Sequence, residues 1–375
     1  MIYLDNSATT RAFDSVASVV QSALTQNYFN ASSPYKKALE AEKAVNAAAK
    51  TVASFLNCRA EELIFTSGGT ESDNTALLCA PAGSEVIVSA AEHHAVLNCQ
   101  RALEARGCRF RLCPVDNTGK VLPEILAGMV NENTGLVSIM HVNNETGTIN
   151  DIAALTSAVK QKNPHTLFHS DGVQAFMHIC ANVKEMGVDL YSISAHKLHG
   201  PKGMGVLYIK KGTPFCPYLF GGGQQQGLRS GTVNTPGILG FAKALEELKS
   251  AEAFSAHLKK IKQEYLRLLT ALPDTQVLGS IDDGAPNILS IAFCGIKAST
   301  LQNALEDSLL LGKGSACTSR SSKISHVLAA MQIPQNTAES AVRLSFGAFN
   351  TAEEAEQAAS LIKEKVEYLR KYKRK

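Results

Sequence analysis

Seven short apolar runs recur between residues 62 and 210, and helix-like stretches fall in several of the gaps between them. The runs are 62–67, 85–90, 109–115, 134–142, 166–171, 189–194 and 205–210. Within each run the apolar positions are nearly continuous, as expected for strands that are covered on both faces. Helical stretches at 95–106 and 151–162 separate some of these runs. The alternation predicts an α/β fold with a mostly parallel seven-stranded sheet.

The pattern changes after a glycine-rich segment at 219–237. A long helical stretch follows from about Ile238 to Leu272, and 285–293 then has the composition of a strand. We expect a domain boundary near residue 250, within the helical stretch. The expected domains are a large one, 13–250, and a smaller α+β one formed by 1–12 together with 251–375.

The composition limits the possible classes of protein, but the net charge points to no particular partner. The chain has 375 residues, enough for two domains. Its net charge of +3 is too near balance to indicate nucleic acid as the main partner. None of the nine cysteines forms a CxxC pair and no secretory signal precedes them, which favours thiols in a reducing compartment. No apolar run approaches the roughly 18 residues that span a bilayer. We therefore expect a cytoplasmic protein with no membrane partner.

Polar residues stand at or directly after the ends of five of the seven predicted strands. They are Gly68–Thr70, Glu92–His94, Asn143–Glu145, Asp171 with Gln174, and His196 with Lys197. Ligands of open α/β sheets bind beyond the carboxyl ends of the strands, so we expect these groups to converge on one site. Gly-Gly-Thr ahead of a helix suits a phosphate, although an ordinary turn has the same sequence. Glu-His-His suggests zinc, but no HExxH motif or cysteine cluster supports a metal.

One cofactor would use all of these groups together. Pyridoxal phosphate needs a lysine for its aldehyde, a carboxylate for its ring nitrogen, and N–H and hydroxyl donors for its phosphate. Lys197, within "SAHKLHGPKG" (194–203), is the expected lysine. Lys202 competes with it, but Lys202 lies inside the "GPKG" turn, where we expect it to face solvent.

Two residues in the second half of the chain have the chemistry of a substrate site. Arg343 lies within the apolar "AVRLSF", and a guanidinium pairs bidentately with a carboxylate. A surface salt bridge is the alternative for this arginine. Cys317 lies in "LGKGSACTSRSSK" (311–323), whose glycine and serine content is typical of a loop. Three basic residues in that segment would favour its thiolate, which is the nucleophilic form.

Nine segments, in this order, resemble those of the cysteine desulfurases, within the class V aminotransferases and the fold-type I pyridoxal phosphate enzymes. They are "YLDNSATT" (3–10), "FTSGGTESDN" (65–74), "EHHAV" (92–96), "VSIMHVNNETG" (137–147), "FHSDGVQ" (168–174), "SISAHKLHGPKG" (192–203), "LRSGT" (228–232), "GSACTS" (314–319) and "RLSFGAFNT" (343–351). The loop around Cys317 resembles that of the subgroup with a long catalytic loop. The chain departs from the usual family pattern at Asn30–Lys37 and at Gln224–Gln226.

The resemblance implies a role for each matching residue. Lys197 would be the Schiff-base lysine, His93 the imidazole stacked on the pyridine ring, and Cys317 the nucleophile. The other implied cofactor contacts are Asp171 at the ring nitrogen, Gln174 and Asn144 near the phenolic oxygen or ring edge, and Gly69, Thr70, Ser194 and His196 at the phosphate. Arg343, with Asn144 beside it, would bind the substrate carboxylate. Thr232 would contact the phosphate across a subunit interface, which implies a homodimer.

The implied reaction converts L-cysteine to L-alanine. Lys197 removes the α-proton, and the Cys317 thiolate takes the substrate sulfur as a persulfide. An iron–sulfur scaffold or another sulfur-acceptor protein would then receive that sulfur. Two alternatives stay open: a class V aminotransferase or lyase that acts on another amino acid with Cys317 incidental, and a non-catalytic subunit that only binds partners.

Overall fold

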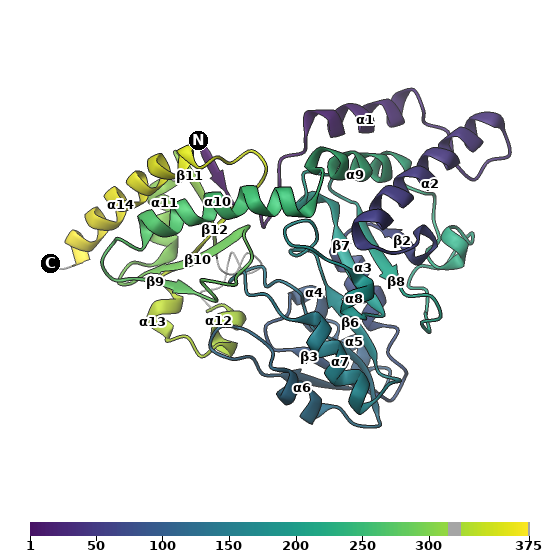
Figure 1. Cartoon of the computed structure of the whole chain (residues 1–375), viewed down its shortest axis with the longest axis horizontal. Helices are drawn as coiled ribbons and strands as arrows, with labels where there is room; N and C mark the ends of the chain where they lie inside the picture. Colours follow the sequence, from purple (N-terminus) through teal and green to yellow (C-terminus); the bar gives the residue numbers. More distant parts are fainter. Residues whose placement is uncertain (314–323, 374–375) are drawn as a thin grey trace.

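A computed structural model of the chain describes residues 1–313 and 324–373, and two β-sheets lie at its centre (Figure 1). The strands are β1 (Ile2–Leu4), β2 (Leu63–Thr66), β3 (Glu85–Ser89), β4 (Arg109–Cys113), β5 (Thr134–Ser138), β6 (Leu167–Asp171), β7 (Leu190–Ser194), β8 (Gly205–Ile209), β9 (Thr275–Leu278), β10 (Ile288–Phe293), β11 (Leu309–Lys313) and β12 (Ala341–Ser345).

Helices surround both sheets. The α-helices are α1 (Asp14–Thr25), α2 (Lys36–Leu56), α3 (Gly69–Leu77), α4 (His94–Leu97), α5 (Gln100–Glu104), α6 (Pro123–Met129), α7 (Ile152–Lys162), α8 (Val183–Met186), α9 (Thr235–Leu248), α10 (Ala251–Leu269), α11 (Ala298–Leu305), α12 (His326–Ala330), α13 (Gln335–Ala338) and α14 (Glu353–Lys373). Short 3₁₀ turns are η1 (Ala60–Glu62), η2 (Ala195–Lys197) and η3 (Gln225–Gly227).

The larger sheet has seven strands in the order β2-β8-β7-β6-β5-β3-β4. Its strands run parallel except β8, which is antiparallel to both of its neighbours. Every residue of β6 and β7 is buried, as their continuous apolar runs predict. Each of the seven predicted runs is one of these strands, so the predicted α/β class with a mostly parallel sheet is confirmed.

The helical stretch predicted from Ile238 to Leu272 is not continuous. It forms α9 and α10, which are separated at Lys249, a residue with a left-handed φ of 67°. The hydroxyl of Ser250 then accepts a hydrogen bond from the N–H of Ala253 at 3.1 Å and caps the start of α10. Serine therefore begins a new helix here, a local cap that the apolar periodicity did not reveal.

The predicted helix at 95–106 is also divided, into α4 and α5. The predicted helix at 151–162 is α7, and the Asp151 carboxylate caps it by accepting from the N–H of Ala154 at 3.0 Å. Two lysines in the last turn of α7 complement the helix dipole. α7 packs along β6, on one face of the larger sheet.

The smaller sheet has the order β1-β11-β12-β10-β9. β1 runs parallel to β11, while the other neighbouring strands are antiparallel. The first residues of the chain therefore pair with a strand that lies some 300 residues further along the sequence. The domain limits, 13–250 and 1–12 with 251–375, stay predictions.

One apolar cluster connects the two sheets. It includes Phe168 and Ile193 from the larger sheet and Leu289 and Leu344 from the smaller sheet. Residues at or just after the carboxyl ends of β5, β6 and β7 line the site described below. Among the helices of the described residues, none is both long and apolar enough to cross a bilayer.

Candidate active site

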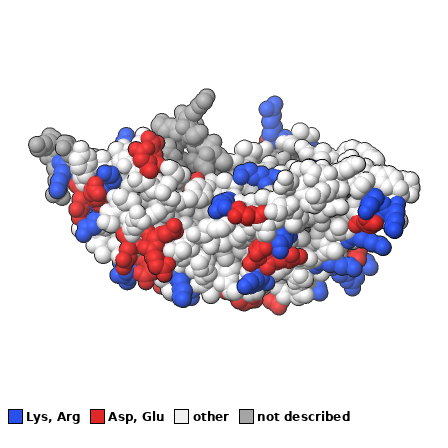
Figure 2. Space-filling model, turned by 90° about the horizontal axis from the view of Figure 1, so that it is seen from above, with Lys and Arg blue, Asp and Glu red and all other residues white. Residues whose placement is uncertain are grey.

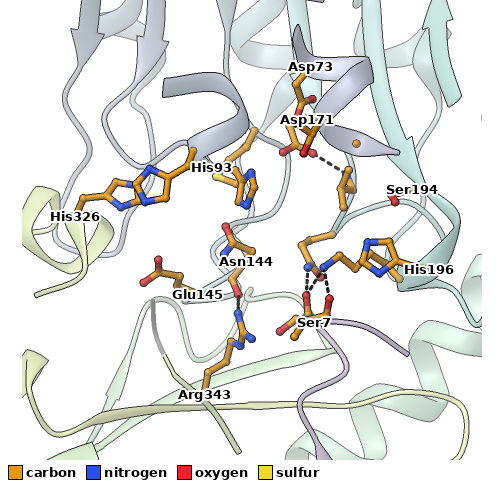
Figure 3. A pocket seen from close by; sticks show the side chains of 18 residues that line it. Ser7, Asp73, His93, Asn144, Glu145, Asp171, Ser194, His196, His326 and Arg343 are labelled. Atoms are coloured by element: carbon orange, nitrogen blue, oxygen red, sulfur yellow. Dashed lines mark hydrogen bonds between the residues drawn. The ribbon is translucent and has the colours of Figure 1, made fainter. Parts of the chain in front are cut away.

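A pocket of about 270 Å³ lies beyond the carboxyl ends of the central strands, between the two sheets (Figure 3). It brings together every predicted site residue except Thr232 and Cys317. The predicted residues that line it are Gly69, Thr70, His93, Asn144, Asp171, Gln174, Ser194, His196, Lys197 and Arg343. These residues lie at or shortly after the carboxyl ends of five strands and in β12, so the predicted convergence at the strand ends is what the structure shows.

The N-terminal segment after β1 fixes Lys197 in the pocket. Lys197 lies in η2, directly after β7. Its Nζ donates to the backbone carbonyl oxygens of Ser7 at 2.6 Å and Ala8 at 2.8 Å. Gln174 binds the same segment, since its Nε2 donates to the carbonyl of Ser7 at 2.9 Å. The amine is therefore held by backbone groups that belong to the opposite side of the site.

The two histidines of "SAHKLHGPKG" have different surroundings. His196 lines the pocket, and its Nδ1 lies 3.1 Å from the hydroxyl of Thr9. His199 is fully buried away from the pocket, where its Nε2 accepts from the N–H of Ala348 at 2.9 Å. Its Nδ1 lies 2.7 Å from the carbonyl of Arg11, to which it donates. His199 thus joins the N-terminal segment to the loop after β12.

The start of α3 has the features of a phosphate site. The backbone N–H groups at the N-terminus of this nine-residue helix face the pocket at Gly69 and Thr70. A Cβ added to Gly69 would lie 2.7 Å from Cγ2 of Val173, so glycine allows the close approach. The hydroxyl oxygen of Ser194, buried at the pocket wall, has no hydrogen-bond partner among the described residues. An oxyanion bound here would supply that partner.

Asp171 ends β6 at the opposite end of the pocket. Its Oδ1 accepts a hydrogen bond from the N–H of Val173 at 2.9 Å. Burial raises the pKa of this carboxyl to about 6, while the Val173 hydrogen bond and the charge of Lys197 lower it. A cationic ring nitrogen placed against Asp171 would favour its ionised form further.

His93 presents a neutral ring to the pocket. Burial, with the positive charges of Lys197 and His94, lowers the pKa of His93 to about 4. Its Nδ1 accepts from the N–H of Ala95 at 3.1 Å, which places the proton of the neutral ring on Nε2. A neutral imidazole held in this way suits stacking against an aromatic cofactor.

Arg343 lies buried in the pocket wall, with only 1% of its side chain exposed. Its Nη2 pairs with Oδ1 of Asp5 at 2.7 Å, and its Nη1 donates to the carbonyl of Asn144 at 2.8 Å. Its Nε has no partner among the described residues. A Cβ on Gly312 would lie 2.8 Å from Nε, so glycine leaves that edge open. The surface salt-bridge alternative for Arg343 is wrong.

Three sequence predictions fall outside this pocket. Thr232 is exposed and does not line the pocket of its own chain. Lys202 is exposed, as predicted, and lines a shallow neighbouring hollow beside the start of α3. Cys317 lies outside the residues that the structure describes, so its predicted role stays a prediction.

Further residues line the pocket that had no individual role in the sequence analysis, although His94 and Glu145 were among the polar groups expected to converge there. They are Ser7, Ala8, Asp73, His94, Glu145 and His326, with Met140 and Val173 as apolar lining. Ser7 and Ala8 act through backbone carbonyls, which no composition signal reveals. Asp73 could have been found, because it lies three and four residues after Thr70 and Gly69 on one face of α3. In the described ranges no group of three His, Cys, Asp or Glu side chains could hold a metal ion.

The donor set fits pyridoxal phosphate. The start of α3 with the unpartnered hydroxyl of Ser194 suits the phosphate, and Asp171 suits the ring nitrogen. Figure 3 shows His93 near Asp171 on one side of the pocket and Ser194 with His196 on the other, and Lys197 lines the same pocket.

Comparisons with known proteins agree with this geometry. A family model described as "Aminotransferase class-V" matches residues 2–358. A protein from Clostridium botulinum named "Cysteine desulfurase IscS" is 38% identical over 371 residues, covering 96% of this chain and 93% of that protein. "Cysteine desulfurase" from Nostoc sp. is 38% identical over 377 residues, covering 99% of this chain and 94% of that protein.

Solved structures resemble the chain over almost its whole length. A structure titled "NIFS-LIKE PROTEIN" has a TM-score of 0.91 at 36% identity, covering 98% of this chain and 99% of that one. A structure titled "SspA in complex with cysteine" has a TM-score of 0.83 at 27% identity, covering 94% of this chain and 100% of that one.

Proposed function

The chain belongs to the aminotransferase class-V family, and we propose from this membership that it is a pyridoxal-phosphate-dependent cysteine desulfurase. It converts L-cysteine to L-alanine and keeps the sulfur as a persulfide. The observation that carries this proposal is the convergence of Lys197, Asp171 and Arg343 on one pocket of about 270 Å³. Relatives named cysteine desulfurase at 38% identity support the choice of L-cysteine as substrate.

Each end of the pocket would hold one part of the cofactor. The start of α3, with Ser194 and His196, would bind the phosphate, and Asp171 with His93 would bind the ring. When bound, pyridoxal phosphate supplies an electron sink for the negative charge that develops next to the substrate amino group. Asp171 favours this by staying ionised against a protonated ring nitrogen.

Arg343 and Lys197 orient the substrate and move its proton. The guanidinium of Arg343 binds the α-carboxylate in a buried setting, where a charged hydrogen bond is stronger than in water. The carboxylate takes up the remaining donors of Arg343, and Asp5 keeps the guanidinium in place. Lys197 Nζ then removes the α-proton, and the carbonyls of Ser7 and Ala8 hold that nitrogen in the pocket.

The sulfur acceptor within the chain is Cys317. Its thiolate attacks the substrate sulfur, the carbon–sulfur bond breaks, and the sulfur stays on Cys317. The complete set of lysine, aspartate and arginine in one pocket disfavours a non-catalytic subunit, because a partner surface does not need it.

We further propose a cytoplasmic homodimer. The exposed position of Thr232, outside its own pocket, supports a contact with the site of a second copy. All cysteines in the described residues are free thiols, which supports a reducing compartment. Relatives named IscS support an iron–sulfur scaffold or another sulfur acceptor as the partner. Figure 2 shows acidic and basic side chains interspersed over the described part of one face, which suits protein partners better than nucleic acid.

The proposal is tested with purified protein loaded with pyridoxal phosphate. Borohydride reduction followed by peptide mapping should find the cofactor on Lys197. L-cysteine should yield L-alanine in the wild type, and Lys197→Ala should yield none because both the anchor and the proton acceptor are lost. Lys202→Ala is the matched control and should keep activity. A folded protein that binds no cofactor, or that forms a keto acid instead of alanine, would falsify the proposal.

A further inference from the structure

A second carboxyl group, Asp73, lies beside Asp171 at one end of the pocket. Asp73 projects from α3, is fully buried, and lines the pocket. Figure 3 shows the two carboxyl groups side by side. Oδ1 of Asp73 has no hydrogen-bond partner among the described residues. The proposed function gives Asp73 no role, although it lies as deep in the site as Asp171.

A chain of buried polar groups leads away from Asp73 across the larger sheet. The side chain of Asp73 hydrogen-bonds the Ser192 hydroxyl of β7. The Ser192 hydroxyl lies 2.9 Å from Nε2 of His169 in β6, and Nδ1 of His169 lies 2.8 Å from the Ser138 hydroxyl in β5. All of these side chains are buried. The chain ends on neutral groups, so it brings no positive charge to Asp73.

The nearby histidine does not act as a counterion. Nε2 of His169 lies 3.6 Å from Oδ1 of Asp73. Burial lowers the pKa of His169 to about 3, so the ring is neutral at physiological pH. An ionised Asp73 would therefore have no cation from this side, and a buried carboxylate without a cation is costly.

The other groups that face Asp73 oppose its ionisation as well. Burial, then the negative charge of Asp171, raise the pKa of Asp73 well above its usual value, and Glu92 adds to this while the Ser192 hydrogen bond lowers it. Cys99 is a neutral thiol, because burial and Asp73 raise its pKa to about 12. Lys197 favours the ionised form of Asp171. Of two adjacent buried carboxyls, only one ionises readily. The positive charge of Lys197 makes Asp171 the one that ionises.

We propose that Asp73 is a positioning residue for Asp171: a neutral carboxylic acid that keeps the proton of the pair and leaves the single negative charge on Asp171. This inference rests on the proposed function, in which Asp171 binds the ring nitrogen of the cofactor. Ser192, His169 and Ser138 border Asp73 in the sheet and bring no charge to it. One ionised carboxylate then faces one protonated nitrogen.

Two substitutions separate a neutral role from a charged one. Asp73→Asn keeps the shape and a neutral donor, so kcat should stay within about threefold of the wild type. Asp73→Ala removes the donor and leaves a gap beside Asp171, so kcat should fall by about 10- to 100-fold. The KM for L-cysteine should change little in both, because Arg343 is untouched. Asp73→Ser gives a second small variant if the alanine protein does not fold.

The absorption of the bound cofactor reports on Asp171 directly. We expect the pH titration of the visible absorption band to have the same midpoint in wild type and Asp73→Asn, and a shifted midpoint in Asp73→Ala. A purely structural Asp73 would change the thermal stability of the variants and leave this midpoint alone in all of them. That result, or an Asp73→Asn enzyme as slow as Asp73→Ala, overturns the inference.

The proton on Asp73 can also be observed without cofactor. The infrared difference spectrum of cofactor-free wild type minus Asp73→Asn at neutral pH should contain a carboxylic acid band and no carboxylate band. Glu71→Gln is the matched control from the same helix. Burial alone would raise the pKa of Glu71, but hydrogen bonds with Arg229 and Ser67 lower it, so its difference spectrum should contain carboxylate bands.

The two proposals fail in different ways. A carboxylate band in the Asp73 difference spectrum overturns the inference even if the wild type is an active desulfurase. A wild type that makes no alanine overturns the proposed function, while the infrared result still decides where the proton of the carboxyl pair resides.

Discussion

Arg343 shows how much of this site depends on the partners of one side chain. Its guanidinium is buried, paired with Asp5 across the pocket wall, and bonded to the carbonyl of Asn144. Because Asp5 directly follows β1 and Arg343 lies in β12, the pairing of these distant segments builds the proposed substrate end of the pocket. Asp5 compensates the buried charge before any substrate binds.

Arg343→Ala should raise the KM for L-cysteine by at least about 30-fold, because removing one side of a buried charged hydrogen bond costs about 2–5 kcal/mol. kcat at saturating substrate should fall much less. Steady-state kinetics of alanine formation measure both constants. Arg267→Ala, which removes an exposed arginine paired with Glu264 on α10, is the matched control. Equal KM values in the two variants would show that the carboxylate binds elsewhere.

The element that positions the proposed phosphate end is β8, the antiparallel strand packed against α3. Gly205 of β8 lies between Thr66 of β2 and Ser194 of β7 in the sheet. A Cβ at Gly205 would lie 2.6 Å from Cα of Gly68. Gly68 itself has a left-handed φ of 153°, a conformation that other residues rarely adopt. Close packing of two glycines therefore sets the position of the helix N-terminus.

Gly205→Ala should push the turn at Gly68 outward and weaken cofactor binding by about tenfold, since overpacking costs on the order of 1–3 kcal/mol. Equilibrium titration with pyridoxal phosphate measures the dissociation constant. Gly128→Ala in α6, where an added Cβ would meet nothing within 4 Å, should bind the cofactor like the wild type. Unchanged affinity in Gly205→Ala would place the phosphate away from this turn.

Helix α12 is joined to the pocket by another buried carboxyl group, that of Glu145. The hydroxyl of Ser325, which caps α12, donates to Oε2 of Glu145. Burial raises the pKa of Glu145 to about 7, although the Ser325 hydrogen bond and the charge of Arg343 lower it. A raised pKa in the folded state means that the contribution to stability is full below the unfolded value of about 4.5 and is lost as pH rises through about 7.

The melting temperature of the wild type should therefore fall relative to that of Glu145→Gln as pH rises from about 4.5 to above 7. The variant has no ionisable group at this position, so its stability lacks this component of the pH dependence. Thermal unfolding at a series of pH values measures the difference. Glu71→Gln serves as the control, because its lowered pKa gives no such loss in this range. A constant difference between wild type and Glu145→Gln would contradict the raised pKa.

Periodicity predicted the seven strands because all but the partly exposed edge strand β4 are mostly buried, and strands buried on both faces leave continuous apolar runs. Strand ends predicted Asp171 and Lys197. The break at Lys249 and Ser250 was missed because a single hydroxyl cap leaves no trace in apolar spacing. The contacts of Lys197 with Ser7 and Ala8 were missed because they use backbone carbonyls. Asp5 was missed as a partner of Arg343 because only the tertiary fold brings the two together.

At the scale of the whole molecule, the segment 225–232, which carries Thr232, is fixed at the edge of the larger sheet. The side-chain amide of Gln225 accepts from the N–H of Phe65 at 2.6 Å and donates to its carbonyl at 2.9 Å, which closes the edge strand β2. Arg229 pairs with Glu71 of α3 at 2.9 Å. Gln225 is one of the positions where the chain departs from the family pattern. The segment thus leaves Thr232 exposed.

Mixing two impaired variants tests whether Thr232 serves the partner subunit. Lys197→Ala and Thr232→Ala would each impair both sites of the proposed homodimer. In a mixed dimer, one site would carry both changes and the other would carry neither. Each mixed dimer should therefore have about half the activity of a wild-type dimer. Alanine formation after unfolding and refolding the mixture measures this, with each variant refolded alone as the control. No rise on mixing would place Thr232 in its own site or outside the site.

The most direct measurement of the central claim is mass spectrometry of the cofactor-loaded protein after incubation with L-cysteine, with alanine measured in the same sample. The account predicts one added sulfur on the peptide that contains Cys317, formed together with L-alanine. Cys317→Ser should show neither product while L-cysteine still changes its visible spectrum. Turnover of L-cysteine without sulfur on Cys317, or full alanine formation by Cys317→Ser, would contradict the account and favour a lyase or aminotransferase.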